Sequence, residues 1–409
     1  TYYVNEDGRL AVTVTDHFPT ADGYVRVNGV LEGKTVQQEQ YALTTSPYIF
    51  VTRTAYTVEG RYRVALNGAD KAGNPAEQVN RNIVVDKTAP KLEILGIEPG
   101  KMTKSPVTLT YQAVDKNHDF DQYKVTVRRT DLAGTNEVLV EQNAADWIKT
   151  GYEAERQQDY TTTKTSTYTT EGNYEITLEG VDKAGNVGAV QTITFSIDHT
   201  APVISDLSYS DVYGLLAPKY GIIFSNQMIR VKFQVTDRVV GVEDSYVYVT
   251  LGEAKDRMAA APLYMARKGE QGYYYVYVPS DVMMTEYDGV ITLWANDRIR
   301  NESDAQTIRL IQNTDKPEIV MDCDLDYTKW QSRDVTFYTK VADNKSGLKE
   351  VTYSVDGKEV KKVEFTEFVK EYTYDLTATK TADKVSGYTV DIRVMNNNGT
   401  ESEASRKVY

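Results

Sequence analysis

Cysteine is nearly absent from this chain, because Cys323 is the only one among 409 residues. A single cysteine cannot form an intrachain disulfide, so the fold has to be stabilised by packing and hydrogen bonding. An oxidising location is still allowed, since a domain can be exported without using disulfides. We expect Cys323, in the segment MDCDLD, to be a partly buried and unreactive side chain.

Long apolar runs and an excess of positive charge are also missing. No run reaches the roughly 18 apolar residues of a membrane-spanning helix, so no insertion into a membrane is predicted. The net charge is −13, which disfavours nucleic acid as a partner and favours cations. Neither a phosphate-binding loop nor a zinc pattern occurs, and His17, His118 and His199 have no nucleophile or ligand at motif spacing. We therefore expect a protein that is not an enzyme.

Internal repeats are the strongest positive signal. The pentapeptide DKAGN occurs at 70–74 and again at 182–186, and each copy is followed at the same distance by a linker, DKTAP at 86–90 and DHTAP at 198–202. Repetition at a fixed distance indicates a repeated structural unit. Weaker copies of the loop and the linker follow at these places: NDRIRN at 296–301, NTDKP at 313–317 and MNNNGT at 395–400. The sequence therefore predicts four copies of one domain.

Within each copy the apolar residues recur at every second position. Tyr62, Val64 and Leu66 alternate with more polar neighbours, which is typical of a half-buried antiparallel strand. Short strands separated by frequent turns favour a β-sandwich. We predict an all-β chain of four tandem Ig-like antiparallel β-sandwiches that form an elongated rod. The predicted domains are 1–87, 88–199, 200–314 and 315–409.

Two segments should depart from this plan. Each copy has a segment that leads into a loop and ends in aspartate: VTVTD, YQAVD, FQVTD and TKVAD. In the first copy this segment already ends at Asp16. Domain 1 is therefore expected to lack most of its leading strand, and the chain to be a fragment of a longer protein. The segment 143–156, NAADWIKTGYEAER, is the one helix-like stretch, and we expect an irregular insertion in domain 2.

These patterns resemble the bacterial Ig-like repeats of Gram-positive surface proteins. The resemblance rests on the run G-x-Y-x-[apolar]-x-L-x-x-x-D-K-A-G-N and on the linker [I/V]-x-[I/V]-D-x-T-A-P. It implies a non-enzymatic, extracellular stalk or adhesin region, located at the cell surface or cell wall, that presents a binding surface for a host or bacterial protein or glycan. Two alternatives stay open: an accessory Ig-like region of a large secreted glycosidase or peptidase, and a purely structural spacer.

The sandwich also assigns roles to tyrosine. Tyr62, Tyr174 and Tyr388 precede their loop at the same spacing, where a tyrosine corner is expected at the start of strand F. The residues two positions later, where Ig domains carry the second cysteine, are Val64, Ile176 and Val390, so an apolar pair should replace the disulfide. In domain 3, Gly289 takes the tyrosine position, so that strand should begin differently.

Acidic residues recur where the repeats join. In an Ig-type sandwich the B–C and F–G loops lie at the pole where the chain enters, so three repeat positions should meet there. They are Asp86, Asp115 and Asp182 at the first junction, Asp198, Asp237 and Asp297 at the second, and Asn313, Asp343 and Asn396 at the third. Grouped carboxylates are the ligands that Ca²⁺ prefers, so each junction is a candidate calcium site, with the third expected to bind worst. The alternative is that each Asp only caps its own turn.

Aromatic side chains are the second candidate site. In domain 3, Tyr246 and Tyr248 are predicted to point outward from one strand, and Tyr273, Tyr275 and Tyr277 should share a face of another. Exposed tyrosines suit contacts with a glycan or a protein. The two strands need not belong to one sheet, so a single patch is not implied. A Lys–Asn isopeptide crosslink, which occurs in related surface domains, is a further possibility without an assigned residue trio.

Overall fold

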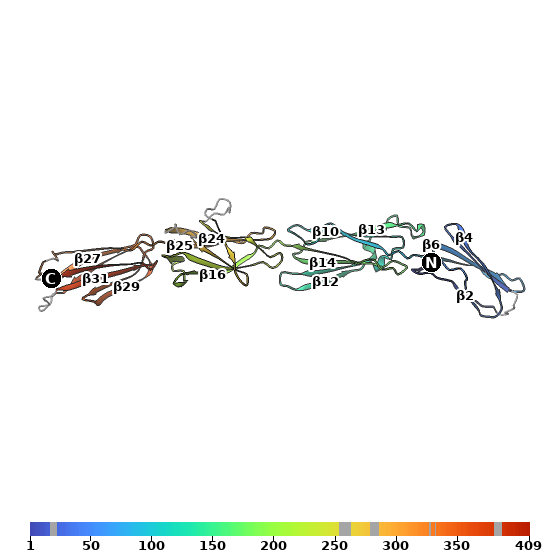
Figure 1. Ribbon diagram of the computed structural model, residues 1–409, viewed down its shortest axis with the longest axis horizontal. Coiled ribbons are helices and arrows are strands. Elements are labelled where there is room, and N and C mark those ends of the chain that lie inside the picture. Colours follow the sequence, from blue (N-terminus) through green and yellow to red (C-terminus); the bar gives the residue numbers. More distant parts are fainter. Residues whose placement is uncertain (17–22, 253–262, 279–285, 327–328, 332, 380–386) are drawn as a thin grey trace. The chain divides into compact units, whose positions relative to one another are not determined.

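The structure is a computed structural model that describes residues 1–16, 23–252, 263–278, 286–326, 329–331, 333–379 and 387–409 (Figure 1). The chain divides into two compact parts, Thr1–His199 and Thr200–Tyr409, which are described separately. Within the described residues the secondary structure is β-strand with three short 3-10 turns and no α-helix. No helix in this part of the chain is long and apolar enough to cross a membrane.

In the first part, residues 2–85 form the sandwich called domain 1. One sheet has the order β1-β7-β6-β3-β4, and the other contains only β2 and β5. The strands are β1 (Tyr2–Val4), β2 (Ala11–Val14), β3 (Gly23–Leu31), β4 (Lys34–Leu43), β5 (Tyr48–Val51), β6 (Gly60–Ala69) and β7 (Val79–Val85). β1 runs parallel to β7, and the neighbouring pairs are antiparallel.

Residues 91–197 form domain 2, which follows the same plan with one strand more. Its sheets have the orders β13-β10-β8 and β12-β11-β14-β15-β9. The strands are β8 (Lys91–Leu95), β9 (Lys101–Thr103), β10 (Val107–Asp115), β11 (Lys124–Thr130), β12 (Asn136–Glu141), β13 (Tyr160–Tyr168), β14 (Gly172–Glu179) and β15 (Gln191–Ile197). The 3-10 turns are η1 (Phe120–Gln122), η2 (Ala144–Asp146) and η3 (Ala154–Arg156). The predicted irregular insertion at 143–156 thus contains two of these turns and no strand.

In the second part, residues 203–312 form domain 3. Its sheets have the orders β17-β16-β19-β23-β22 and β18-β25-β24-β20-β21. The strands are β16 (Val203–Asp211), β17 (Gly214–Leu216), β18 (Ile222–Ser225), β19 (Ile229–Thr236), β20 (Val242–Leu251), β21 (Leu263–Met265), β22 (Arg267–Lys268), β23 (Tyr273–Val278), β24 (Tyr287–Asp297) and β25 (Gln306–Gln312).

Residues 318–408 form domain 4, with sheets of order β26-β27-β30 and β29-β28-β31-β32. The strands are β26 (Glu318–Cys323), β27 (Val335–Ala342), β28 (Leu348–Val355), β29 (Lys358–Val369), β30 (Glu371–Ala378), β31 (Tyr388–Asn396) and β32 (Glu401–Val408). Each domain has its own apolar core between its two sheets. The prediction of an all-β chain of tandem sandwiches is confirmed, and the predicted boundaries fall between these four residue ranges.

The tyrosine corners are present in domains 1 and 2. The hydroxyl of Tyr62 donates to the carbonyl of Val58 at 2.9 Å, and that of Tyr174 donates to the carbonyl of Thr170 at 2.6 Å. The residues at the cysteine positions, Val64, Ile176 and Val390, are buried. In domain 3 the ring of Tyr287 occupies the space over Gly289, where an added Cβ would lie 2.7 Å from the Tyr287 hydroxyl oxygen. A larger residue at this position would therefore have to displace the side chain of Tyr287.

Candidate metal centre

One turn closes the same loop in all four domains. The backbone N–H of the first residue donates to the carbonyl four positions on, in the pairs Asp70–Asn74, Asp182–Asn186, Asp297–Asn301 and Asn396–Thr400. The side-chain oxygen of the first residue accepts the returning N–H in each case. Gly73 and Gly185 have φ of 85° and 90°, a left-handed conformation that glycine adopts without strain. DKAGN is thus a turn, and its weaker copies fold alike.

The two identical pentapeptides nevertheless place their first residue in different surroundings. Asp70 is a surface carboxylate whose pKa is lowered, first by the Asn74 amide and then by the Asn74 backbone N–H. Asp182 accepts the same hydrogen bonds from Asn186, but its pKa is raised because it is buried and because Asp86 lies nearby. The difference therefore comes from what surrounds the turn and not from the turn itself.

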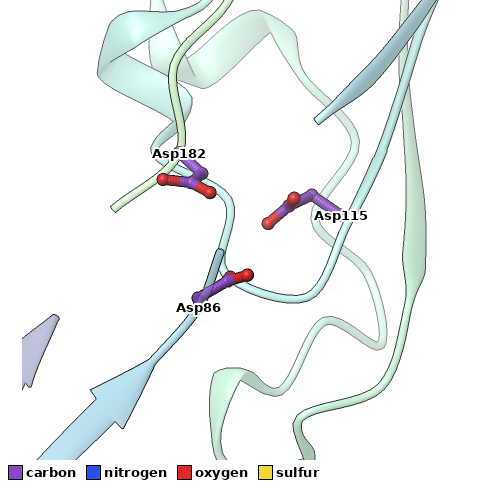
Figure 2. A group of neighbouring side chains, drawn as sticks. All are labelled: Asp86, Asp115 and Asp182. Carbon is purple, nitrogen blue, oxygen red and sulfur yellow. The ribbon is translucent and has the colours of Figure 1, made fainter. Parts of the chain in front are cut away.

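Figure 2 shows what surrounds Asp182: the carboxylates of Asp86, Asp115 and Asp182 point toward a shared space. One oxygen from each lies within 4.8 Å of the others, and all three side chains are buried. Asp86 follows β7 of domain 1, Asp115 ends β10 and Asp182 follows β14 of domain 2. The structure therefore brings together the three acidic residues predicted for the first junction.

This cluster carries negative charge that no cationic side chain balances. Among the described residues, no lysine, arginine or histidine forms an ion pair with Asp86, Asp115 or Asp182. Burial, together with the nearby carboxylates of Asp86 and Asp182, raises the pKa of Asp115 to about 7. Bringing three carboxylates into one buried site is unfavourable unless a proton or a cation compensates for their repulsion.

The hydrogen bonds around the cluster hold the carboxylates in place but leave one oxygen unused. Oδ1 of Asp115 accepts from the N–H of Asn117 at 2.5 Å, while Oδ2 accepts no hydrogen bond from a described residue. Asp86 accepts from the N–H of Thr88 and from the side-chain amide of Asn117. The capping role proposed as the alternative is therefore real, yet it does not use all the oxygens. Fixed carboxylates with free lone pairs fit a hard cation such as Ca²⁺.

The side-chain amides of Asn117 and Asn186 hold this junction together. The sequence did not predict either of them as a junction residue. Asn186 donates from Nδ2 both to Asp182 and to the backbone carbonyl of Asp86, at 2.7 Å and 2.8 Å, so it ties the linker to the F–G loop of domain 2. Asn117 is fully buried and connects Asp86 to Gln157, which directly follows the insertion. The recurrence of Asn at the end of DKAGN was the available signal.

The residues predicted for the second junction are divided between the two parts of the chain. Asp198 lies in the first part, whereas Asp237 and Asp297 lie in the second. In the second part, burial and the nearby Asp297 raise the pKa of Asp237, although the Gly241 N–H bond opposes this shift. A calcium site made by all three residues stays a prediction.

The third junction differs in charge from the first. Asn396 stands where domain 2 has Asp182, and its Nδ2 donates to Asp343 at 2.8 Å and to the carbonyl of Asp315 at 3.1 Å. Asn313 stands where the first junction has Asp86, and its Oδ1 accepts from the N–H of Asp315. At the three repeat positions this junction has a single carboxylate beside an amide donor, an arrangement that needs no cation. That this junction binds Ca²⁺ worst stays a prediction.

The predicted aromatic site is only partly correct. Tyr248 is 1% exposed and stacks on Trp294 with ring centroids 6.4 Å apart, so the prediction that it points into solvent is wrong. Both faces of β20 are covered at this point, since Val247 and Val249 are also buried. Tyr246 is half-buried, and the guanidinium of Arg300 lies over its ring.

The other tyrosines form a row on one face of β23. Tyr273 and Tyr275 are half-buried and Tyr277 is exposed, while the alternate residues of β23 are buried. Lys232 lies over the ring of Tyr273 and Arg230 over that of Tyr275, both from the neighbouring strand β19. β23 and β20 belong to different sheets, so Tyr246 is not part of this row.

The histidines and the single cysteine are the remaining residues that the sequence singled out. His118 is fully buried, with Nε2 donating to the carbonyl of Tyr160 and Nδ1 accepting from the hydroxyl of Tyr123. His199 is exposed, and His17 lies outside the described residues. Cys323 is half-buried, as expected, and its Sγ contacts the carbonyl of Leu325.

No protein-family model matches this chain, and no curated protein matches it. Several solved structures are similar to this chain at low sequence identity. They include the fibronectin(III)-like modules of Clostridium thermocellum CbhA (14% identity, 48% of this chain and 88% of that chain, TM-score 0.25), an ICAM-5 D1-D4 ectodomain fragment (11%, 99% and 96%, 0.30) and the chicken CNTN1 FN1-FN3 domains (13%, 77% and 98%, 0.25). Such weak likenesses carry no argument about function, so the site has to be interpreted from its own geometry.

Proposed function

We propose that this chain is a non-enzymatic, extracellular stalk or adhesive segment of a bacterial surface protein, whose first domain junction binds Ca²⁺. The chain consists of tandem sandwiches, which suits a stalk or an accessory region. Its excess of acidic residues and its single cysteine fit an exported protein that uses ions in place of disulfides. An accessory region of a secreted glycosidase or peptidase, and a spacer without a ligand, are the rival proposals.

The observation that supports calcium is the convergence of Asp86, Asp115 and Asp182 without a counter-cation. The three carboxylates come from the linker and from two loops of domain 2, so an ion bound to all three would fix the linker against domain 2. Ca²⁺ takes six to eight oxygen ligands, typically, and the rest would be water and carbonyl oxygens. The ion would replace the proton that Asp115 otherwise holds near neutral pH.

The test compares two identical turns. In wild-type protein, added Ca²⁺ should raise the unfolding temperature of the first part over that measured in EDTA. Asp182→Asn should abolish most of this increase, because it removes one of the three carboxylates. Asp70→Asn is the matched control, since it changes the same pentapeptide away from the cluster. Equal responses of the two variants would refute the calcium site.

The row of tyrosines on β23 supports the adhesive version of the proposal. Tyr275 and Tyr277 pack edge to face with centroids 6.2 Å apart, beside the cationic side chains of β19. Aromatic rings with adjacent cations suit a glycan or a protein surface. Screening of glycans and matrix proteins against wild type and the Tyr275→Ala, Tyr277→Ala double variant tests this. Binding that survives the double variant would remove the row from the proposal, and no binding by wild type would favour the spacer.

A further inference from the structure

The face of domain 3 that carries the tyrosine row of β23 also carries three cationic side chains. Residues directly opposite each other on antiparallel strands point to the same face of a sheet. Lys232 of β19 lies opposite Tyr275 on one side, and Arg267 of β22 lies opposite Tyr275 on the other. Arg230 lies opposite Tyr277. These five residues form what we call the cationic face.

The charges of the cationic face are spread around Tyr275. Residues two positions apart on a strand are about 7 Å apart, and two strand spacings across a sheet are about 10 Å. Arg230 and Lys232 are two positions apart on β19, and Arg267 lies on the far side of β23 from both. A ligand that meets all three charges therefore has to carry several separate anionic groups.

No carboxylate of the described residues neutralises these cations. Lys268, the residue next to Arg267 on β22, pairs with Asp244 at 2.8 Å. By contrast, Arg230, Lys232 and Arg267 form no ion pair within the described part of the chain. Arg267 is exposed, and the two cations of β19 are half-buried. On a chain of net charge −13, a group of three unpaired cations creates a local potential that attracts anions.

Tyrosine rings hold two of the cations in place. The guanidinium of Arg230 lies 4.9 Å from the ring centroid of Tyr275, and the ammonium of Lys232 lies 4.2 Å from that of Tyr273. Such contacts stabilise a cation without removing its charge, and a side chain that is already held loses less entropy on binding. Asp206 accepts a hydrogen bond from the Tyr273 hydroxyl at 3.3 Å. This acidic neighbour excludes Tyr273 from the cationic face.

The place of β19 and β23 in their sheet favours a sugar over a peptide as the ligand. β19 pairs with β16 and β23, and β23 pairs with β19 and β22. Neither strand therefore offers an open edge, which is what an extended peptide uses to add to a sheet. Recognition is left to the rings and the cations. Tyrosine offers an apolar ring and a hydroxyl to a sugar, and guanidinium groups match the geometry of carboxylates.

We propose that the cationic face binds an acidic polysaccharide. Its carboxylates would pair with Arg230, Lys232 and Arg267, and its sugar rings would pack on Tyr275 and Tyr277. This inference rests on the proposed adhesive role of the tyrosine row, and it adds the charge of the ligand. Because the attraction is between exposed charges, binding should be strongest at low salt.

The probe is a fluorescently labelled oligogalacturonate, titrated against the full chain in EDTA so that no calcium ion bridges the two. The fully methyl-esterified oligomer has the same sugars without the charge, and it should bind about tenfold more weakly. Equal binding of the two oligomers that Tyr275→Ala, Tyr277→Ala abolishes would overturn this inference and leave the adhesive proposal standing. Wild type that does not bind oligogalacturonate would also overturn it.

Neighbouring residues of β22 provide matched variants that locate the site. Arg267→Gln should weaken oligogalacturonate binding severalfold, and Arg267→Gln together with Lys232→Gln should weaken it about tenfold. Lys268→Gln also removes one positive charge, but from the side chain that pairs with Asp244, so the affinity should stay unchanged. Equal losses in the two single variants would overturn the proposal, because net charge alone would then explain binding. Tighter binding of an oligoglutamate of equal charge would also overturn it, in favour of an acidic protein.

Discussion

At the scale of single residues, surroundings decide what an aspartate does. Asp70 and Asp182 begin the same pentapeptide and accept the same hydrogen bonds, yet their pKa values are shifted in opposite directions. The buried carboxylates of Asp86 and Asp115 lie beside Asp182. Asp70 does not belong to this cluster. The repeated turn could be predicted from the sequence, whereas the pKa shift required knowing which side chains converge.

The raised pKa of Asp115 makes the metal-free protein sensitive to pH. Its folded-state pKa of about 7 lies above the unfolded value, so this carboxyl stabilises the fold at low pH and that contribution is lost as the pH rises toward 7. In EDTA, wild type should therefore lose about 2–3 kcal/mol of unfolding free energy between about pH 5 and pH 8 relative to Asp115→Asn.

Buried His118 changes the stability with pH in the opposite direction. For this reason wild type is compared with the Asp115→Asn variant, which keeps His118. Burial lowers the pKa of His118, so its contribution is lost as the pH falls below its unfolded value of about 6.5. Both proteins keep this histidine, and its effect cancels in the difference. Denaturant titrations at several pH values measure the difference in unfolding free energy between wild type and Asp115→Asn. Parallel pH profiles for these two proteins would show that Asp115 is not the titrating group.

At the scale of strands, period-two patterning predicts well where a strand has one buried face. The strand β14 alternates between buried and half-buried or exposed residues as expected from GNYEITLE. The same reasoning failed for Tyr248, because β20 is buried on both faces around that residue and its pattern contains no solvent side.

The tyrosine corner of domain 2 provides a test at this scale. Tyr174→Phe keeps the ring, which stacks on Phe195 at 4.7 Å, and removes only the hydroxyl that bonds the carbonyl of Thr170. Loss of this bond should lower the unfolding free energy by about 1–2 kcal/mol. Denaturant unfolding measures the change, with Tyr277→Phe at an exposed position as control. A change in Tyr174→Phe no larger than in the control would mean that the corner does not stabilise the domain.

At the scale of the whole molecule, the first and third junctions use the same backbone turns with different charge. The first has three carboxylates at the repeat positions, and the third has Asn313, Asp343 and Asn396. This difference was readable from the sequence, because the repeats align the positions. The amide contacts that hold the junctions, such as Asn186 to the carbonyl of Asp86, were not, since they join residues far apart in the chain.

If charge decides calcium binding, the third junction can be converted. The double variant Asn313→Asp, Asn396→Asp supplies three carboxylates there and removes the Asn396 amide that donates to Asp343. It should be less stable than wild type in EDTA and should regain stability with Ca²⁺. Thermal unfolding with and without Ca²⁺ measures both effects. A variant that is destabilised but unresponsive to Ca²⁺ would show that the carboxylates alone do not make the site.

The most direct measurement is calorimetric titration of the metal-free full chain with Ca²⁺ at about pH 8, where Asp115 is deprotonated. Relative to wild type, Asp182→Asn should lose one bound ion, and Asp70→Asn should lose none. Wild type that binds no Ca²⁺, or an Asp182→Asn variant that binds as many ions as wild type, would contradict the central claim that the first junction is a calcium site.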